Sequence, residues 1–212
     1  MAKQVMLPMS YPPDLLKEWS MKHCRMLTAS GACDYLKAIL SGKVARRCGG
    51  RRFFGEAYVA AQVKHQSGYY GSFKWLTNAR FSNDRPFRKG PTRTFQEELR
   101  TALLKHFGKR QLDRLRERAR EFETRSGVRP VAPDLWLIDR QGNHRFIEVK
   151  LPGDRIRPAQ RAGLALIKSC LRTKTRLSIE VVDLKPEHTS KDGSRTRKGR
   201  ANKRMHPTAA AR

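Results

Sequence analysis

Apolar residues recur at helical or strand spacing along most of the first 184 residues. Positions three, four and seven apart lie on one face of a helix, whereas alternate positions lie on one face of a strand. By this criterion helical segments precede residue 134 at residues 14–27, 53–64, 95–107 and 112–122, and a further short helix is expected over residues 35–40. Residues 69–77 alternate in the way that a half-buried strand requires.

The stretch from residue 134 to residue 160 has the most regular pattern. Asp134 opens a short apolar strand, residues 140–143 form a turn, and a second strand follows over residues 146–151. A period of two places Glu148 and Lys150 on the same face of that second strand. A helix starting at Pro158 and a last strand over residues 176–184 complete the predicted elements.

Composition changes this picture from an ordinary α/β domain to one with a polyanionic partner. Lys and Arg number 46 against 19 acidic residues, so the formal charge is +27. Such an excess favours nucleic acid, whose phosphates would neutralise it, over a merely solubilising surface or an anionic lipid layer. The sequence contains no run of 18 apolar residues, which is what a membrane-spanning helix would need.

The N-terminal residues lack the pattern of a secretion signal, so we expect the protein in the cytoplasm, or at the nucleoid if it is bacterial. There the four cysteines should be reduced. Their spacing is not that of a zinc site, although His23 beside Cys24 leaves a ligand cluster open.

Asp134, Glu148 and Lys150 are the candidate chemical groups. Two carboxylates can hold a magnesium ion that keeps several of its waters, and an amine beside them can orient a water or neutralise charge on a phosphate. A Glu-x-Lys triplet alone is weak support, because most such pairs lie on strand surfaces. The preceding Pro-Asp, the turn and the upstream Glu56 make the combination more specific.

The sequence FIEVKLPGDRIRPAQ resembles the VRR-NUC branch of the PD-(D/E)xK nuclease superfamily. Glu148, Val149 and Lys150 match its E-V-K motif, the P-G-D-R motif follows, and Gln160 falls on its helix glutamine. The resemblance covers roughly residues 53 to 184. It implies a restriction-endonuclease-like αβββαβ core with a mixed central sheet.

The resemblance also implies Mg²⁺- or Mn²⁺-dependent hydrolysis of DNA, often branched or flapped, in repair, recombination or mobile-element processes. RNA and a homodimer stay open. The residues that it assigns to catalysis or metal binding are Asp134, Glu148, Val149, Lys150, Gln160 and an upstream acid. We expect that acid to be Glu56, with Glu98 as the rival, and Lys74 and Arg155 to contact phosphates.

The expected organisation is a helical N-terminal extension over residues 1–50, a nuclease domain over 51–184 and a basic, disordered tail over 185–212. If Glu56 is the upstream acid, the helices at about 95–125 are an insertion in that domain. Two other functions stay open. The chain could be a non-catalytic nucleic-acid-binding module on the same fold, or a ribosome-associated basic protein.

Overall fold

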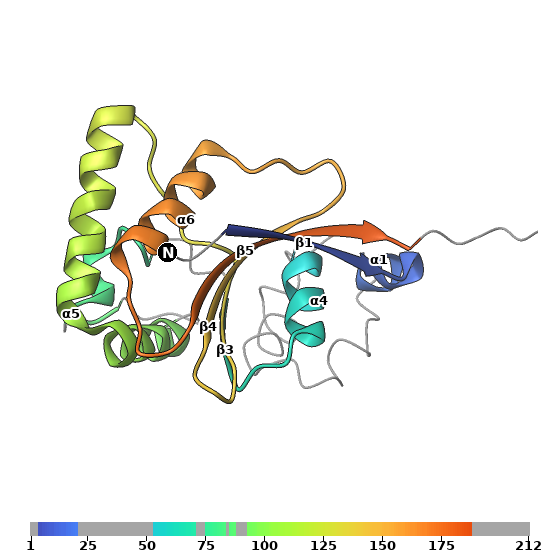
Figure 1. Ribbon diagram of the computed structural model, residues 1–212, viewed down its shortest axis with the longest axis horizontal. Helices are drawn as coiled ribbons and strands as arrows, with labels where there is room; N and C mark the ends of the chain where they lie inside the picture. The colour runs from blue at the N-terminus through green and yellow to red at the C-terminus, as the bar shows by residue number, and fades with distance from the viewer. Residues whose placement is uncertain (1–3, 21–52, 71–74, 84, 88–92, 188–212) are drawn as a thin grey trace, which may run out of the picture.

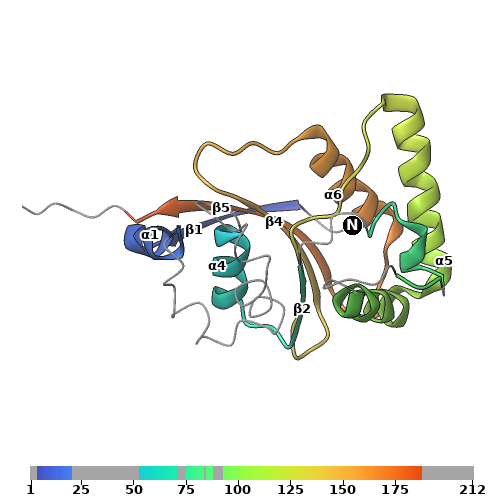
Figure 2. The same cartoon turned by 180° about the vertical axis from the view of Figure 1, so that it is seen from behind.

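The computed structural model describes residues 4–20, 53–70, 75–83, 85–87 and 93–187. These residues form a five-stranded mixed sheet in the order β1-β5-β4-β3-β2, with helices on both faces (Figures 1 and 2). β5 (Leu177–Pro186) pairs in parallel with β1 (Gln4–Tyr11) and β4 (His144–Lys150). β3 (Leu135–Ile138) pairs antiparallel with β4 and β2 (Ser67–Tyr70).

The predicted fold class is confirmed. α4 (Phe54–Gln62), β2, β3, β4, α6 (Pro158–Cys170) and β5 follow one another in the order αβββαβ. α5 (Arg93–Ser126) lies between β2 and β3, where a helical insertion was expected. The two predicted helices follow one another directly and are separated by a kink at Gly108. The φ of Gly108 is 71°, a positive value that glycine adopts without strain.

The N-terminal region differs from the predicted helical extension, because β1 belongs to the central sheet. Pro8 lies within this strand and lacks an N–H. The strand tolerates it because β1 is at the edge of the sheet, where proline is usually found. α1 (Pro13–Ser20) follows, as a shorter helix than the predicted one. The rest of that prediction, and most of the predicted tail, lie outside the described residues.

β2 is also shorter than the strand predicted over residues 69–77. It ends at Tyr70, and Trp75 lies in a turn, although its side chain is buried. A short 3-10 helix, η2 (Ala79–Phe81), then leads toward α5. Tertiary packing, rather than strand alternation, therefore explains the apolar residues of this segment.

The two faces of the sheet carry separate hydrophobic clusters, as the period of two predicts. Leu135, Ile147 and Val149 pack toward α1 and α4, while Trp136 and Phe146 pack toward α5 and α6. Glu148 and Lys150 share the parity of Phe146, so they lie on the α6 side of β4. The sheet thus fixes which helix the polar pair meets.

α6 lies unusually close to the segment that leads into β3. Val131 N donates to Ala159 O (3.1 Å), and a Cβ on Gly163 would lie 1.7 Å from Val131 O. Glycine at position 163 thus lets the helix approach this backbone, which enters β3 at Asp134.

Gly163→Ala should destabilise the protein by about 1–3 kcal/mol, because the new methyl group overlaps the Val131 carbonyl. Helix propensity alone predicts the opposite, a gain of about 1 kcal/mol. Urea unfolding measures the difference. As a control, Ala165→Gly on the exposed side of the same helix should lose about 1 kcal/mol. A Gly163→Ala protein more stable than the wild type would contradict this packing.

Candidate active site

The register of β3 and β4 brings Asp134 opposite Glu148. Leu135 pairs with Ile147 in this antiparallel ladder, so the positions one step further out are 134 and 148. The carboxylate of Asp134 is turned onto β4, where its Oδ2 accepts a hydrogen bond from Val149 N (2.8 Å). Both acidic side chains are buried.

The turn between the strands stabilises this register. Asp139 Oδ1 accepts hydrogen bonds from the backbone N–H groups of Gln141 (2.8 Å) and Asn143 (2.9 Å). A carboxylate bound in this way closes a tight turn. It lies at the far end of β3 from Asp134, so Asp139 has the structural role that its position in a turn predicts.

Glu148, Lys150 and Gln160 form a buried hydrogen-bonded triangle. Lys150 Nζ donates to Glu148 Oε1 (2.7 Å) and to Gln160 Oε1 (3.1 Å), and Gln160 Nε2 donates to Glu148 Oε1. The Gln160 oxygen also accepts from Arg157 N (3.0 Å) at the start of α6. Gln160 therefore joins α6 to the ion pair of β4 and fixes both partners of that pair.

Glu148 Oε2 is different, since it is buried and accepts no hydrogen bond from a donor group of the described residues. Its acidic neighbour Asp134 can bond Glu148 only when one of the two carboxyl groups carries a proton, which raises the pKa of Glu148. A buried carboxylate oxygen without a donor is costly. A hard cation or a water bound to it would supply the missing partner. This orphaned oxygen is the feature of the site that most clearly fits a metal ion.

Burial disfavours the charged forms of three carboxyl groups here, and repulsion from Asp134 adds to the effect on two of them. Burial raises the pKa of Glu148 to about 8, and repulsion from Asp134 adds to that shift. The same two causes raise the pKa of Glu56 to about 7. Burial also raises the pKa of Asp134, against the hydrogen bond from Val149 and the charge of Lys150.

Glu56 reaches this group from the opposite side of the sheet. It lies in the first turn of α4, whose apolar residues pack on β3 and β4. Its charge interacts with Asp134 and Lys150, so the structure places it at the same end of the strands. Glu98, by contrast, is exposed on α5 in a groove with Tyr69 and His106, and no interaction connects it with Asp134.

Two other expected site residues, Val149 and Arg155, are not part of the triangle. Val149 offers its backbone N–H to Asp134, while its side chain is buried in the core. Arg155 is exposed in the loop between β4 and α6, and Lys74 lies outside the described residues. Sequence reasoning missed Arg157, whose charge favours the ionised form of Asp134. Its position just before Pro158, at a helix start, is the signal that could have identified it.

No group of three His, Cys, Asp or Glu side chains in the described ranges stands at metal-ligand spacing. The donor set is instead the pair Asp134 and Glu148, with Glu56 further out. Magnesium is commonly held by one or two carboxylates together with waters and substrate phosphates, so a complete protein cage is not required. The residues present fit such an ion.

This fold and site define a restriction-endonuclease-like protein. Residues 79–182 match the family model of the VRR-NUC domain, so this part of the chain is similar to that family. The domain is of nuclease type, which implies a nucleic-acid substrate. No curated protein and no solved structure matches the chain. No helix within the described ranges is long and apolar enough to cross a membrane.

The matched range begins later than the expected resemblance, which started near residue 53. It contains Asp134, Glu148 and Lys150, and it includes Glu98 but not Glu56. The family match and the geometry thus favour different upstream acids. The choice of Glu56 rests on its position beside Asp134.

Without a divalent cation, the raised pKa values should make the protein less stable as the pH rises. The folded state keeps protons on Glu148 and Glu56 that the unfolded chain releases above their ordinary pKa of 4.5. This contribution is complete below pH 4.5 and is lost as the pH passes about 7 to about 8. Asp134→Asn keeps an acceptor for Val149 N but removes the repulsion.

In EDTA at pH 8 we expect Asp134→Asn to raise the free energy of unfolding by about 0.5–2 kcal/mol, and the difference from the wild type to shrink at pH 5. Urea unfolding at both pH values tests this. Asp139→Asn is the matched control and should destabilise, because hydrogen bonds from Asn143 lower the pKa of Asp139. Equal losses from both substitutions would show that Asp134 is not under electrostatic strain.

Proposed function

We propose that the protein is a metal-dependent nuclease that hydrolyses phosphodiester bonds of DNA. The observation that carries the proposal is the meeting of Asp134, Glu148 and Lys150 at one end of β3 and β4, with a buried Glu148 oxygen that lacks a partner. The family match supports a nuclease in general. The metal, the DNA preference and the catalytic roles below are parts of this proposal.

Asp134 and Glu148 would hold a Mg²⁺ or Mn²⁺ ion. When bound, such an ion lowers the pKa of a water and neutralises charge that develops on the phosphate. It would also offset the burial that raises the pKa of both carboxyl groups and the repulsion from Asp134 that adds to the shift of Glu148. A site that is electrostatically unfavourable when empty thus becomes favourable when a cation and a phosphate enter.

Lys150 is the residue that we assign to the reacting phosphate. Its ammonium group has three N–H donors, and Glu148 and Gln160 use two of them. The third can hydrogen-bond the attacking water or a phosphate oxygen. Because Gln160 and Glu148 fix the amine, it needs little reorganisation as the reaction proceeds. Gln160 is thus a positioning residue.

Glu56 completes the acidic end of the site in this proposal. Its carboxyl group lies beside Asp134, and a pKa of about 7 lets it exchange a proton near neutral pH. Glu56 can therefore accept the proton of the attacking water. A preference for branched or flapped DNA, a role in repair and a cytoplasmic location stay predictions.

A second candidate function follows from the Lys150 to Glu148 ion pair. The pair occupies one oxygen of Glu148, and a site that stayed in this arrangement would bind nucleic acid without cutting it. Salt-sensitive DNA binding that survives Asp134→Asn, with no magnesium binding, would favour such a module. The orphaned oxygen of Glu148 favours the nuclease.

The purified protein should cleave plasmid and branched DNA with Mg²⁺ or Mn²⁺ and stop when EDTA is added. Lys150→Ala should lower single-turnover cleavage about a hundredfold or more, as the loss of a fixed donor to a developing charge does. Glu56→Gln should also lower cleavage, whereas Glu98→Gln should leave it unchanged, because Glu98 lies apart from Asp134.

Circular dichroism and DNA binding in EDTA are the controls for folding and for substrate affinity. Full activity of Glu56→Gln together with loss of activity in Glu98→Gln would reverse the assignment of the upstream acid. Activity that is equal in the wild type and in Lys150→Ala would contradict the proposed site as a whole.

A further inference from the structure

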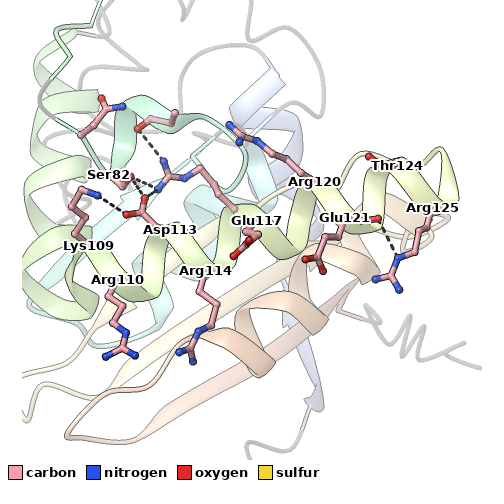
Figure 3. Close-up of a pocket in the computed structure, with 13 residues that line it drawn as sticks. Ser82, Lys109, Arg110, Asp113, Arg114, Glu117, Arg120, Glu121, Thr124 and Arg125 are labelled. Atoms are coloured by element: carbon pink, nitrogen blue, oxygen red, sulfur yellow. Dashed lines mark hydrogen bonds and ion pairs between the residues drawn. The ribbon is translucent and has the colours of Figure 1, made fainter.

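A groove of about 1450 Å³ runs between the second half of α5 and residues 79–83 (Figure 3). We name it the α5 groove. Its lining includes the cations Lys109, Arg110, Arg114, Arg116, Arg120 and Arg125, and the acids Asp113, Glu117 and Glu121. This surface is separate from the triangle of Glu148, Lys150 and Gln160, none of which lines it.

One side of the groove is held by a buried arginine, although alternating charges such as those of this helix face are typical of a solvated surface. Arg116 donates to Ala79 O (3.1 Å), to Asp113 Oδ1 (2.7 Å) and to Ser82 Oγ. Lys109 Nζ donates to Asp113 Oδ2 (2.7 Å). Asp113 therefore has two cationic partners, and the second half of α5 is tied to the η2 segment.

Three other arginines of the groove do not pair with protein groups as Arg116 does. Arg110, Arg114 and Arg120 are exposed, and none forms an ion pair or hydrogen bond with another described residue. Figure 3 shows Arg110 and Arg114 pointing to one side of the helix and Arg120 to the other. Glu121, which could have paired with them, lies 3.4 Å from Arg118 instead. Three guanidinium groups are thus available to a ligand.

Their spacing fits a phosphate backbone. Arg110 and Arg114 differ by about 6 Å in height along the helix axis, close to two steps of about 3.4 Å along one DNA strand. Guanidinium groups bind phosphate oxygens through paired N–H donors. The groove has six cationic and three acidic side chains, and one of the acids, Asp113, is already paired with two cations. Its net charge is therefore positive, as phosphate binding requires.

One end of the α5 groove continues into the segment that leads to Asp134, while Gln111, near the other end, bonds Arg172 after α6. Eight residues lie between Arg125 and Asp134, so their Cα atoms lie at most about 32 Å apart, and Arg120 lies about 8 Å further along the helix. In both views the end of α5 and the loop between β4 and α6 lie on the side of the sheet that α6 covers (Figures 1 and 2). A duplex that enters the site past this loop can therefore approach the end of α5.

We propose that the α5 groove binds the sugar-phosphate backbone of the duplex DNA whose phosphodiester bond is cut. The inference rests on the proposed function for the identity of the ligand, but the binding itself needs neither metal nor cleavage. Arg110 and Arg114 contact phosphates on one side of the helix, Arg120 contacts a phosphate on the other side, and Arg116 keeps the helix in place.

The test compares two triple variants of the full chain that lose the same charge. The first is Arg110→Gln, Arg114→Gln, Arg120→Gln. The matched control is Arg140→Gln, Lys174→Gln, Arg176→Gln, whose exposed side chains lie at the end of the sheet away from Asp134. Fluorescence anisotropy in EDTA gives the affinity for duplex and single-stranded DNA of equal length over a range of salt concentrations.

The groove variant should bind duplex DNA at least about tenfold more weakly at low salt, and the slope of log K against log salt should become shallower by about 2–3, or about 0.9 for each lost phosphate contact. The control should change the slope by less than about 1. The proposal would be overturned if the slope were unchanged in the groove variant. It would also be overturned if the control lost as much duplex affinity as the groove variant, or if the groove variant lost as much affinity for single strands as for duplex DNA.

If the triple variant does not fold, as judged by circular dichroism, Arg114→Gln alone should reduce the slope by about 0.9, and no reduction would overturn the proposal. Failure of this inference is distinguishable from failure of the proposed function. A protein that cleaves DNA but shows no effect of the groove variant is a nuclease without this interface. One that never cleaves but loses duplex binding has the interface without the chemistry.

Discussion

The site depends on like charges being buried together. Antiparallel pairing of β3 and β4 puts Asp134 opposite Glu148, and the packing of α4 adds Glu56 to the same end of the strands. Burial removes the three carboxyl groups from water, and Lys150 does not offset this, so their pKa values rise. Folding alone would not favour such an arrangement. A bound cation with a phosphate ligand would.

The rest of the fold serves to hold this arrangement. The α6 helix contributes Gln160, which binds both Lys150 and Glu148, and Gly163 lets the helix lie against the segment that leads into Asp134. The two hydrophobic clusters fix the sheet between its helices. Each side chain of the site is thus positioned by a secondary-structure element with its own buried face, as a preorganised site requires.

Sequence periodicity was sufficient to predict on which face of a strand or helix a side chain lies, because that depends only on local backbone geometry. A period of two correctly placed Glu148 and Lys150 on one face of β4, and helical spacing placed Glu56 beside an apolar stripe on α4. The resemblance supplied Gln160, whose partners no spacing rule could have identified. That these residues meet in space is a finding of the structure, while their catalytic roles stay predictions.

Features that depend on distant partners were missed. The N-terminal region was expected to be helical, but β1 pairs with β5 and tolerates Pro8 because it pairs on one side only. Arg116 lies among alternating charges that predict a solvated surface, yet Ala79, Ser82 and Asp113 bury it. In both cases the environment comes from a segment more than thirty residues away. A single sequence contains no local signal of such contacts.

Calorimetric titration with Mn²⁺ at pH 7, in two buffers of different ionisation enthalpy, tests the central claim most directly. With carboxyl pKa values of about 7 and about 8, Glu56 and Glu148 hold protons in the metal-free protein, so the account predicts that Mn²⁺ binds and releases protons. It also predicts that Asp134→Asn weakens this binding. Absence of Mn²⁺ binding, or binding that is unchanged without the Asp134 carboxylate, would contradict it.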